Sequence, residues 1–243
     1  MQSNEDVTDL LDDVRTSMAD LTAALEDDPG GPQTLTAICA EAVRVVPGAD
    51  MASITSITGR TPRTEAHTDE RALKVDLAQY EAGYGPCLEA ARTGQTVRVS
   101  TGTAHELWPD FVEPALRHGV RSYLAAPLRV DDRLSGAINL FGFEDHGFHE
   151  TDGKLLELYT TVVAFCLRTA RRYRETRELA ENLRAAMQSR AVIEQAKGIL
   201  MAVHKITDEQ AIGRLIEQSQ RQNVKLREVA TEFVRRMSED EDA

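Results

Sequence analysis

The chain contains few cysteines and no long apolar run. Its three cysteines are widely spaced in 243 residues, so they provide no zinc-site spacing, and their scarcity fits a reducing compartment. No apolar run approaches the roughly 18 residues that suggest a membrane span. The first residues are acidic and lack the apolar core of a signal peptide. We therefore expect a cytoplasmic protein without a membrane segment.

The sequence also lacks the motifs of an enzyme. It contains no nucleophile–base arrangement, no phosphate-binding loop and no carboxylate motif with catalytic spacing, so we predict no catalysis. His146 and His149 lie three residues apart in one loop without a third ligand nearby in the sequence, so we predict no metal site. The length predicts one or two domains.

Positive charge is scarce overall but is concentrated in one segment. The net charge is −12, made up of −14 in residues 1–167, +6 in residues 168–237 and −4 in residues 238–243. A basic segment between acidic ones is compatible with phosphate binding. An ordinary solvated helical surface has the same composition, so charge alone leaves both interpretations open.

Residues 1–30 are predicted to form an acidic amphipathic helix that ends at the prolines and glycines of residues 29–32. Its apolar residues recur at steps of three and four, which is the heptad pattern of a coiled coil. They are Val7, Leu11, Val14, Met18, Leu21 and Leu25. This seam must be buried against the rest of the chain or against a second copy.

The pattern between residues 34 and 169 predicts an α+β domain with an antiparallel sheet. We expect a hairpin near the end, followed by a helix from Asp152 that is capped by Thr151. Further helices are expected over residues 34–46, 70–80, 86–93 and 109–118, and strands over 49–57, 63–67, 96–99, 121–128 and 134–143.

The helix from Asp152 is predicted to continue, because no glycine or proline interrupts residues 154–197. Residues 170–188 are expected to form a solvated helical connector. A second heptad seam accompanies the first part of this helix. It consists of Leu155, Tyr159, Val162, Cys166, Thr169 and Tyr173. Two seams in one chain predict a coiled coil and a homodimer.

Three segments of the first domain resemble the GAF family over residues 34–169. They read YGPCLEAARTGQTVRV, RSYLAAPLRVDDRLSGAINLF and FHETDGKLLELYTTVVAFCL. The resemblance implies a sensor domain, for which the sequence defines no cofactor; a small-molecule effector is expected. Asn139, Phe148 and Asp152 match part of the pattern of cyclic-nucleotide-binding members. Leu140 and Gly153 depart from it, which argues against that ligand.

Cys87 follows Pro86 at a predicted helix start. A helix dipole would lower the pKa of its thiol, which would suit a redox or nitric-oxide sensor. A buried structural thiol is the alternative interpretation.

Residues 189–237 are predicted to form an all-α bundle of three helices. The first carries Gly198 in its middle, which indicates either close approach of another group or exposure to solvent. Thr207 and Gln210 form a capping box that opens the second helix. The third begins at Asn223. The apolar residues of the first helix that share one face are Val192, Ile193, Ala196, Ile199, Leu200 and Val203.

The bundle resembles the ANTAR family of RNA-binding domains of transcription antiterminators. The match begins near Leu179 and rests on QAKGILM at residues 195–201 and on NVKLREVA at residues 223–230. Ile212 departs from the aromatic residue that the family usually has there. The resemblance implies binding to RNA stem-loops and either antitermination or altered translation. Residues 238–243 form an acidic tail.

Six polar side chains of the bundle are the candidates for contact with RNA: Arg190, Gln195, Lys197, Asn223, Lys225 and Arg227. Lys197 is expected to be an exposed lysine. Asn223 fits an N-cap of the third helix equally well. Two alternative functions stay open, a dimeric sensory scaffold that does not bind RNA and a DNA-binding regulator that uses its third helix.

Overall fold

The computed structural model describes residues 31–132 and 134–239 and divides the chain into two compact units, residues 1–173 and 174–243. The predicted heptad helix of residues 1–30 lies outside the described residues. Within the described part of the chain, no helix is long and apolar enough to cross a membrane.

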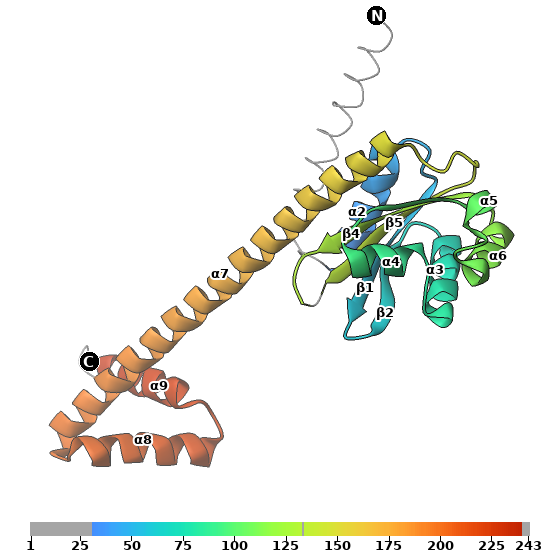
Figure 1. Cartoon of the computed structure of the whole chain (residues 1–243). Helices are drawn as coiled ribbons and strands as arrows, with labels where there is room; N and C mark the ends of the chain where they lie inside the picture. The colour runs from blue at the N-terminus through green and yellow to red at the C-terminus, as the bar shows by residue number, and fades with distance from the viewer. Residues whose placement is uncertain (1–30, 133, 240–243) are drawn as a thin grey trace, which may run out of the picture. The chain divides into compact units, whose positions relative to one another are not determined.

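The N-terminal unit is built on a five-stranded antiparallel sheet with the strand order β2-β1-β5-β4-β3 (Figure 1). Its strands are β1 (Met51–Thr58), β2 (Thr61–His67), β3 (Val97–Ser100), β4 (Ser122–Arg129) and β5 (Ser135–Gly142). The predicted antiparallel sheet is confirmed. Each predicted strand has a counterpart within a few residues.

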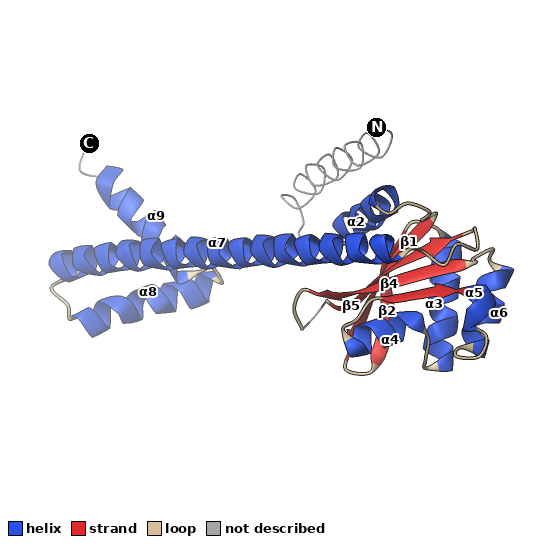
Figure 2. Ribbon diagram, turned by 45° about the horizontal axis from the view of Figure 1, so that its top comes forward, coloured by secondary structure: helices blue, strands red, loops and turns tan. Residues whose placement is uncertain are grey.

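Helices cover both faces of this sheet (Figure 2). One face packs against α2 (Pro32–Val45) and the first turns of α7 (Glu150–His204). The other face packs against α3 (Glu70–Ala82), α4 (Pro86–Thr93), α5 (Thr101–Ala104) and α6 (Pro109–Arg117). Helix α5 was not predicted, because four residues are too short to show a helical period.

Strand alternation decides what each face of the sheet presents, because successive side chains point to opposite sides. On the central strand β5, Ile138 and Leu140 join the core beneath α2 and α7, whereas Ala137 and Phe141 join the core beneath α3 and α4. Asn139 lies on this second side. The α3 side of the sheet is therefore partly polar in its interior.

The start of α7 corrects two predictions. The helix begins at Glu150, so Thr151 is not its cap. Instead, the Asp152 carboxylate accepts a hydrogen bond from the backbone N–H of His149 at 2.6 Å.

The second heptad seam is also wrong as a free surface. Tyr159 is buried, and its hydroxyl donates to the carbonyl of Ile38 at 2.8 Å. Leu155 and Cys166 pack on the same core. Tyr173 alone of the predicted seam is a large exposed apolar side chain. The other large apolar side chains that α7 exposes between residues 150 and 190 are Leu158, Phe165, Leu179, Leu183 and Met187.

The C-terminal unit consists of α7 from Arg174 onward, α8 (Asp208–Gln222) and α9 (Leu226–Glu239). Thr207 and Gln210 form the predicted capping box of α8. The small buried core of this unit comprises Ala196, Leu200, Ala211, Leu215, Val229 and Ala230. The predicted all-α character of this region is confirmed. One side chain departs from the predicted face, since Val203 is 56% exposed.

Two further details of this unit follow from backbone geometry. Asn223 has a φ of 53°, in the left-handed region, and ends α8. It is therefore a C-cap and not the N-cap of the third helix. A Cβ added at Gly198 would meet nothing within 4 Å among the described atoms. This glycine is exposed rather than crowded by another helix.

Gly136 provides a test of the sheet. A Cβ at this position would lie 1.9 Å from the carbonyl oxygen of Thr55 on β1. We expect Gly136→Ala to lower the free energy of unfolding by about 3 kcal/mol or more, because the paired backbones must separate. Chemical denaturation measures the change.

Gly213→Ala is the matched control, since its Cβ would also meet nothing within 4 Å in α8. It should stabilise the protein by about 1 kcal/mol, the helix propensity difference between alanine and glycine. Equal effects of the two substitutions would contradict the close β1–β5 approach.

Candidate functional site

A buried polar cluster lies between the sheet and helices α3 and α4 of the N-terminal unit. Its fully buried members come from β1, α3, α4, β4 and β5, and Thr64 and Tyr80 border it. These members are Ser53, Thr55, Asp76, Gln79, Cys87, Tyr123 and Asn139. Buried polar groups are stable when they are hydrogen-bonded to one another, which is the arrangement here.

Asn139 is the centre of this network. Its Nδ2 lies 3.0 Å from Ser53 Oγ, 3.0 Å from Thr55 Oγ1 and 3.4 Å from Asp76 Oδ1. Its Oδ1 is buried without a hydrogen-bond partner among the described atoms. An amide nitrogen has only two protons, so it cannot serve three acceptors fully at once.

Gln79 joins the cluster to the turn between α3 and α4. Its Nε2 donates to the hydroxyl of Tyr123 at 3.0 Å, and its Oε1 accepts from the backbone N–H of Cys87 at 2.9 Å. A Cβ at Gly85 would lie 2.5 Å from that same Oε1. The turn therefore needs glycine there, because Gln79 occupies the space of a side chain.

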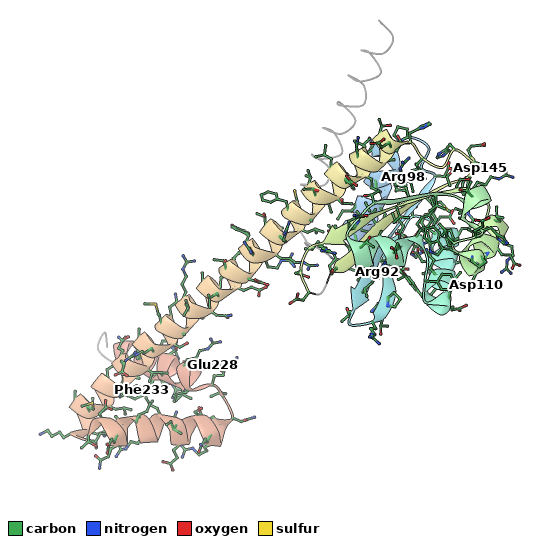
Figure 3. All side chains as sticks on the ribbon, in the orientation of Figure 1. Arg92, Arg98, Asp110, Asp145, Glu228 and Phe233 are labelled. Atoms are coloured by element: carbon green, nitrogen blue, oxygen red, sulfur yellow. The ribbon has the colours of Figure 1, made fainter. Side chains whose placement is uncertain are left out.

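The same turn is fastened from outside. The Tyr84 hydroxyl donates to the carboxylate of Asp110, at the start of α6, where Figure 3 labels Asp110. On the edge strand β3, the Arg98 guanidinium donates to the carbonyl of Phe148 at 3.0 Å. The first contact joins the α3–α4 turn to α6, and the second joins β3 to the loop that precedes α7.

Cys87 is not the activated thiol that a helix start would produce. It is fully buried, and burial raises the pKa of its thiol to about 12, with the charge of Asp76 adding to the effect. Its Sγ donates to Thr55 Oγ1 at 3.3 Å. The predicted lowering of its pKa is wrong, because desolvation outweighs the helix dipole at this site.

Asp76 is the one carboxyl group inside the cluster. Burial raises its pKa to about 7, against hydrogen bonds from Ser53, Thr64 and Tyr123 that favour the ionised form. Thr64 Oγ1 donates to its Oδ2 at 3.1 Å. Asp76 was not singled out from the sequence. Its position on the same helical face as Ala72 and Val75, which are apolar, was an available signal of burial.

The residues that match the cyclic-nucleotide pattern have structural roles here. Asn139 belongs to the cluster, while Asp152 holds the N-terminus of α7 and Phe148 packs in the core beneath α2. The structure does not bring these three together around one site. His146 contacts the carbonyl of Gly48 at 3.1 Å, and the described residues contain no group of three or more potential metal ligands.

In the C-terminal unit, the structure changes the interpretation of Lys197. Its side chain is 10% exposed, and its Nζ lies 2.5 Å from Asp208 Oδ1 and 3.1 Å from Glu194 Oε2. The hydrogen bond to Asp208 and then that to Glu194 raise the pKa of this lysine. The expectation of an exposed lysine is wrong, because the start of α8 brings a carboxylate over it.

The other five predicted side chains lie on exposed positions: Arg190, Gln195, Asn223, Lys225 and Arg227. Arg190, Lys225 and Arg227 form no ion pair with any residue that the structure describes. By contrast, Glu232 binds both Arg235 and Arg236, and these contacts lower its pKa to about 2.

A shallow groove of about 380 Å³ connects α7 with α9 in this unit. Arg227 and Thr231 line it from α9, and Gln188 and Ser189 line it from α7, next to Arg190. Figure 3 labels Glu228 and Phe233 on α9, and Phe233 packs against the core of the unit. Gln188 and Ser189 were missed from the sequence, because nothing in a helical period distinguishes them.

Comparison with known families identifies both units. Residues 32–168 match the GAF domain family and residues 181–234 match the ANTAR domain. The chain belongs to the GAF family and carries an ANTAR domain. It therefore combines a sensor domain with a regulatory domain, and it is a signal-responsive regulator. No curated protein matches the sequence.

Solved structures with a similar fold include domains of sensory proteins and an enzyme. The Stigmatella aurantiaca phytochrome photosensory core module is 14% identical, with a TM-score of 0.51 over 88% of this chain and 44% of that one. The Thermosynechococcus elongatus PixJ GAF domain is 13% identical, with a TM-score of 0.47 over 69% and 96%. A type II free methionine-R-sulfoxide reductase from Thermoplasma acidophilum is 17% identical, with a TM-score of 0.45 over 61% and 96%.

Lys197 is expected to matter for stability. Lys197→Ala leaves the carboxylates of Asp208 and Glu194 without their shared cation next to a six-residue core, so we expect a lower thermal midpoint for the C-terminal unit. Circular dichroism during heating measures it. Arg190→Ala, seven residues earlier on the same helix, should leave the midpoint unchanged.

A double-mutant cycle identifies the cause. Lys197→Ala and Asp208→Asn together should cost less than the sum of the single changes, because each removes the same ion pair. Strict additivity would show that the contact contributes nothing.

Proposed function

We propose that this protein is a signal-responsive RNA-binding regulator, in which the GAF domain detects an input and controls how the ANTAR domain binds RNA stem-loops. The outcome is transcription antitermination or altered translation. The observation that carries the proposal is the presence of both domains in one chain. In the division we propose, residues 34–169 are the sensor, 170–188 a helical connector and 189–237 the RNA-binding domain.

The charge of the C-terminal unit supports an RNA interface. Arg190, Lys225 and Arg227 are exposed and form no ion pair with a described residue, so each can meet a phosphate without first losing a carboxylate. Arg227 also lines the groove between α7 and α9, together with Ser189, which precedes Arg190 in the chain. The polar side chains of this groove can hydrogen-bond an unpaired base. We place Gln195 and Asn223 at the edge of this surface.

Lys197 takes a different part in this proposal. With two carboxylates within 3.1 Å, it is poorly placed to contribute a full positive charge to RNA. Its position in the family motif has a sufficient explanation in the joint between α7 and α8. We retain it as a residue that positions the surface around Arg190 and Gln195.

On the sensor side, we propose that the input is detected in the buried polar cluster beneath α3 and α4. The unpaired Oδ1 of Asn139 supports this location, because a buried acceptor without a donor is costly unless another group satisfies it. A small-molecule effector with a hydrogen-bond donor would suit that acceptor. We propose binding and not catalysis as the activity of the chain, which acts in the cytoplasm.

The RNA surface can be tested by salt dependence. Arg190→Ala, Lys225→Ala and Arg227→Ala should each weaken binding to an RNA hairpin and lower the slope of log K against log salt by roughly 0.7 to 0.9 units, the contribution of one phosphate contact. Binding is measured by fluorescence anisotropy at several salt concentrations.

Arg214→Ala is the matched control, an exposed arginine on α8 that lies outside the proposed surface. It should leave the slope unchanged. Duplex DNA is measured in parallel, since tighter binding to duplex DNA would favour a DNA-binding regulator. Absence of binding to both nucleic acids would favour the sensory scaffold.

We also propose a homodimer that forms along α7. Among the exposed apolar residues of α7, Leu158, Phe165 and Leu179 recur at multiples of seven, and Leu183 lies four residues after Leu179. That spacing is a coiled-coil seam. It replaces the seam through Tyr159, which the domain's own core covers.

Leu183→Glu should shift the protein toward monomer, because it places a charge in the proposed seam. Light scattering at micromolar concentration measures the mass. Ala185→Glu introduces the same charge two residues later on a different side of the helix, about 200° away, and should leave the mass unchanged. A monomeric parent protein would rule out the dimer.

A further inference from the structure

The GAF domain contains a carboxyl group whose surroundings favour a proton. Asp76 is fully buried on the inner side of α3, and the groups that hydrogen-bond it are hydroxyls and one amide. In the described part of the chain, none of the groups that shift its pKa is a cation. An isolated carboxylate in such a place is destabilised strongly, so it takes up a proton more readily than in water.

The titratable groups that couple to Asp76 come from several elements. They are Cys39 of α2, Tyr80 of α3, Cys87 of α4 and Tyr123 of β4. Burial raises the pKa of each of these thiols and phenols, so all four are neutral near pH 7. Asp76 is therefore the member of the group that changes charge in the neutral range.

Charged side chains on the packed elements are engaged elsewhere or face water. On β2, Glu65 accepts a hydrogen bond from Ser56 at 2.6 Å, and Arg63 is exposed and is not among the groups that shift the pKa of Asp76. The remaining charged side chains of α3 and of α6, which packs against it, are exposed: Glu70, Arg71, Lys74, Glu81, Asp110, Glu113 and Arg117.

Asn139 supplies the structural response to that proton. With Asp76 ionised, the amide turns its Nδ2 toward Asp76 Oδ1, Ser53 Oγ and Thr55 Oγ1, and its Oδ1 has no described donor. With Asp76 protonated, a half-turn of the amide would present Oδ1 to the same three groups. The carboxyl O–H and one of the two hydroxyls could then donate to its two lone pairs.

We propose that Asp76 is a proton-uptake site that gives this sensor domain a pH input, and that the proton sets the orientation of the Asn139 amide between α3 and the central strands. One proton enters from solvent, and the charge of Asp76 changes from −1 to 0. The effect extends along α3, since Gln79 three residues later holds the backbone of Cys87 and the hydroxyl of Tyr123. The proposal does not depend on RNA binding.

Carboxyl NMR of the full chain tests the site directly. With ¹³C-labelled aspartate, one side-chain carboxyl resonance should titrate with a midpoint near the pKa of about 7 and should be missing in Asp76→Asn. Asp132→Asn, an exposed residue in the β4–β5 turn, is the control that should leave this resonance in place. An Asp76 resonance that is already ionised at pH 5 overturns the proposal.

The Asn139 side chain provides the second readout. Its ¹H–¹⁵N amide signals should move with the same midpoint in the parent protein and should not move with pH in Asp76→Asn. If Asp76→Asn does not fold, Thr64→Val serves instead. Loss of the donor to Oδ2 should shift both midpoints to higher pH. Amide signals of Asn139 that ignore the titration overturn the coupling.

The pH dependence of stability provides an independent test of the proposal. The pKa of Asp76 is about 7 in the folded protein and about 3.9 in an unfolded chain, so the folded state holds the proton more tightly. The stabilisation is fully present below about pH 4 and is lost as the pH rises through 7. The thermal midpoint of the parent, relative to Asp76→Asn, should therefore fall between pH 5 and pH 8; a rise would contradict the proposal.

Discussion

The antiparallel pairing of β1 with β5 is the constraint on which the N-terminal unit depends. Ser53 lies opposite Asn139, and Ile54 lies opposite Ile138. Because side chains alternate along a strand, this register places two polar groups on one face and two apolar groups on the other. A shift by one residue would bury polar groups beneath α2 and α7 and remove the scaffold of the polar cluster. The close approach at Gly136 holds the register in place.

Helix α7 belongs to two hydrophobic cores. Leu156, Val163 and Leu167 complete the core beneath α2, and Ala196 and Leu200 start the core of the C-terminal unit. Residues between them are mostly exposed, so their helical state relies on propensity and local pairs such as Arg177 with Glu181 at 2.9 Å.

The two candidate sites differ in whether their polar groups are buried or exposed to solvent. In the cluster beneath α3 and α4, buried polar side chains hydrogen-bond one another, and the amide oxygen of Asn139 is left without a donor among the described atoms. In the ANTAR domain, Lys197 is largely buried and paired with carboxylates, whereas Arg190 is exposed to solvent. Burial of the first site is the basis of our proposal of a proton or small-donor input, and exposure of the second is the basis of our proposal of a large anionic partner.

The sequence by itself determined the elements and the two families, because period-two and period-3.6 patterns, the Thr207–Gln210 capping box and the motif at residues 195–201 are local signals. Tertiary structure alone decided the environments. Whether Lys197 is free depends on Asp208 folding back onto it, whether Cys87 is reactive depends on its depth, and whether Tyr159 can join a dimer depends on α2 covering it. Burial and charge pairing arise between residues that are distant in the chain, and a pattern along the chain does not record which of them meet.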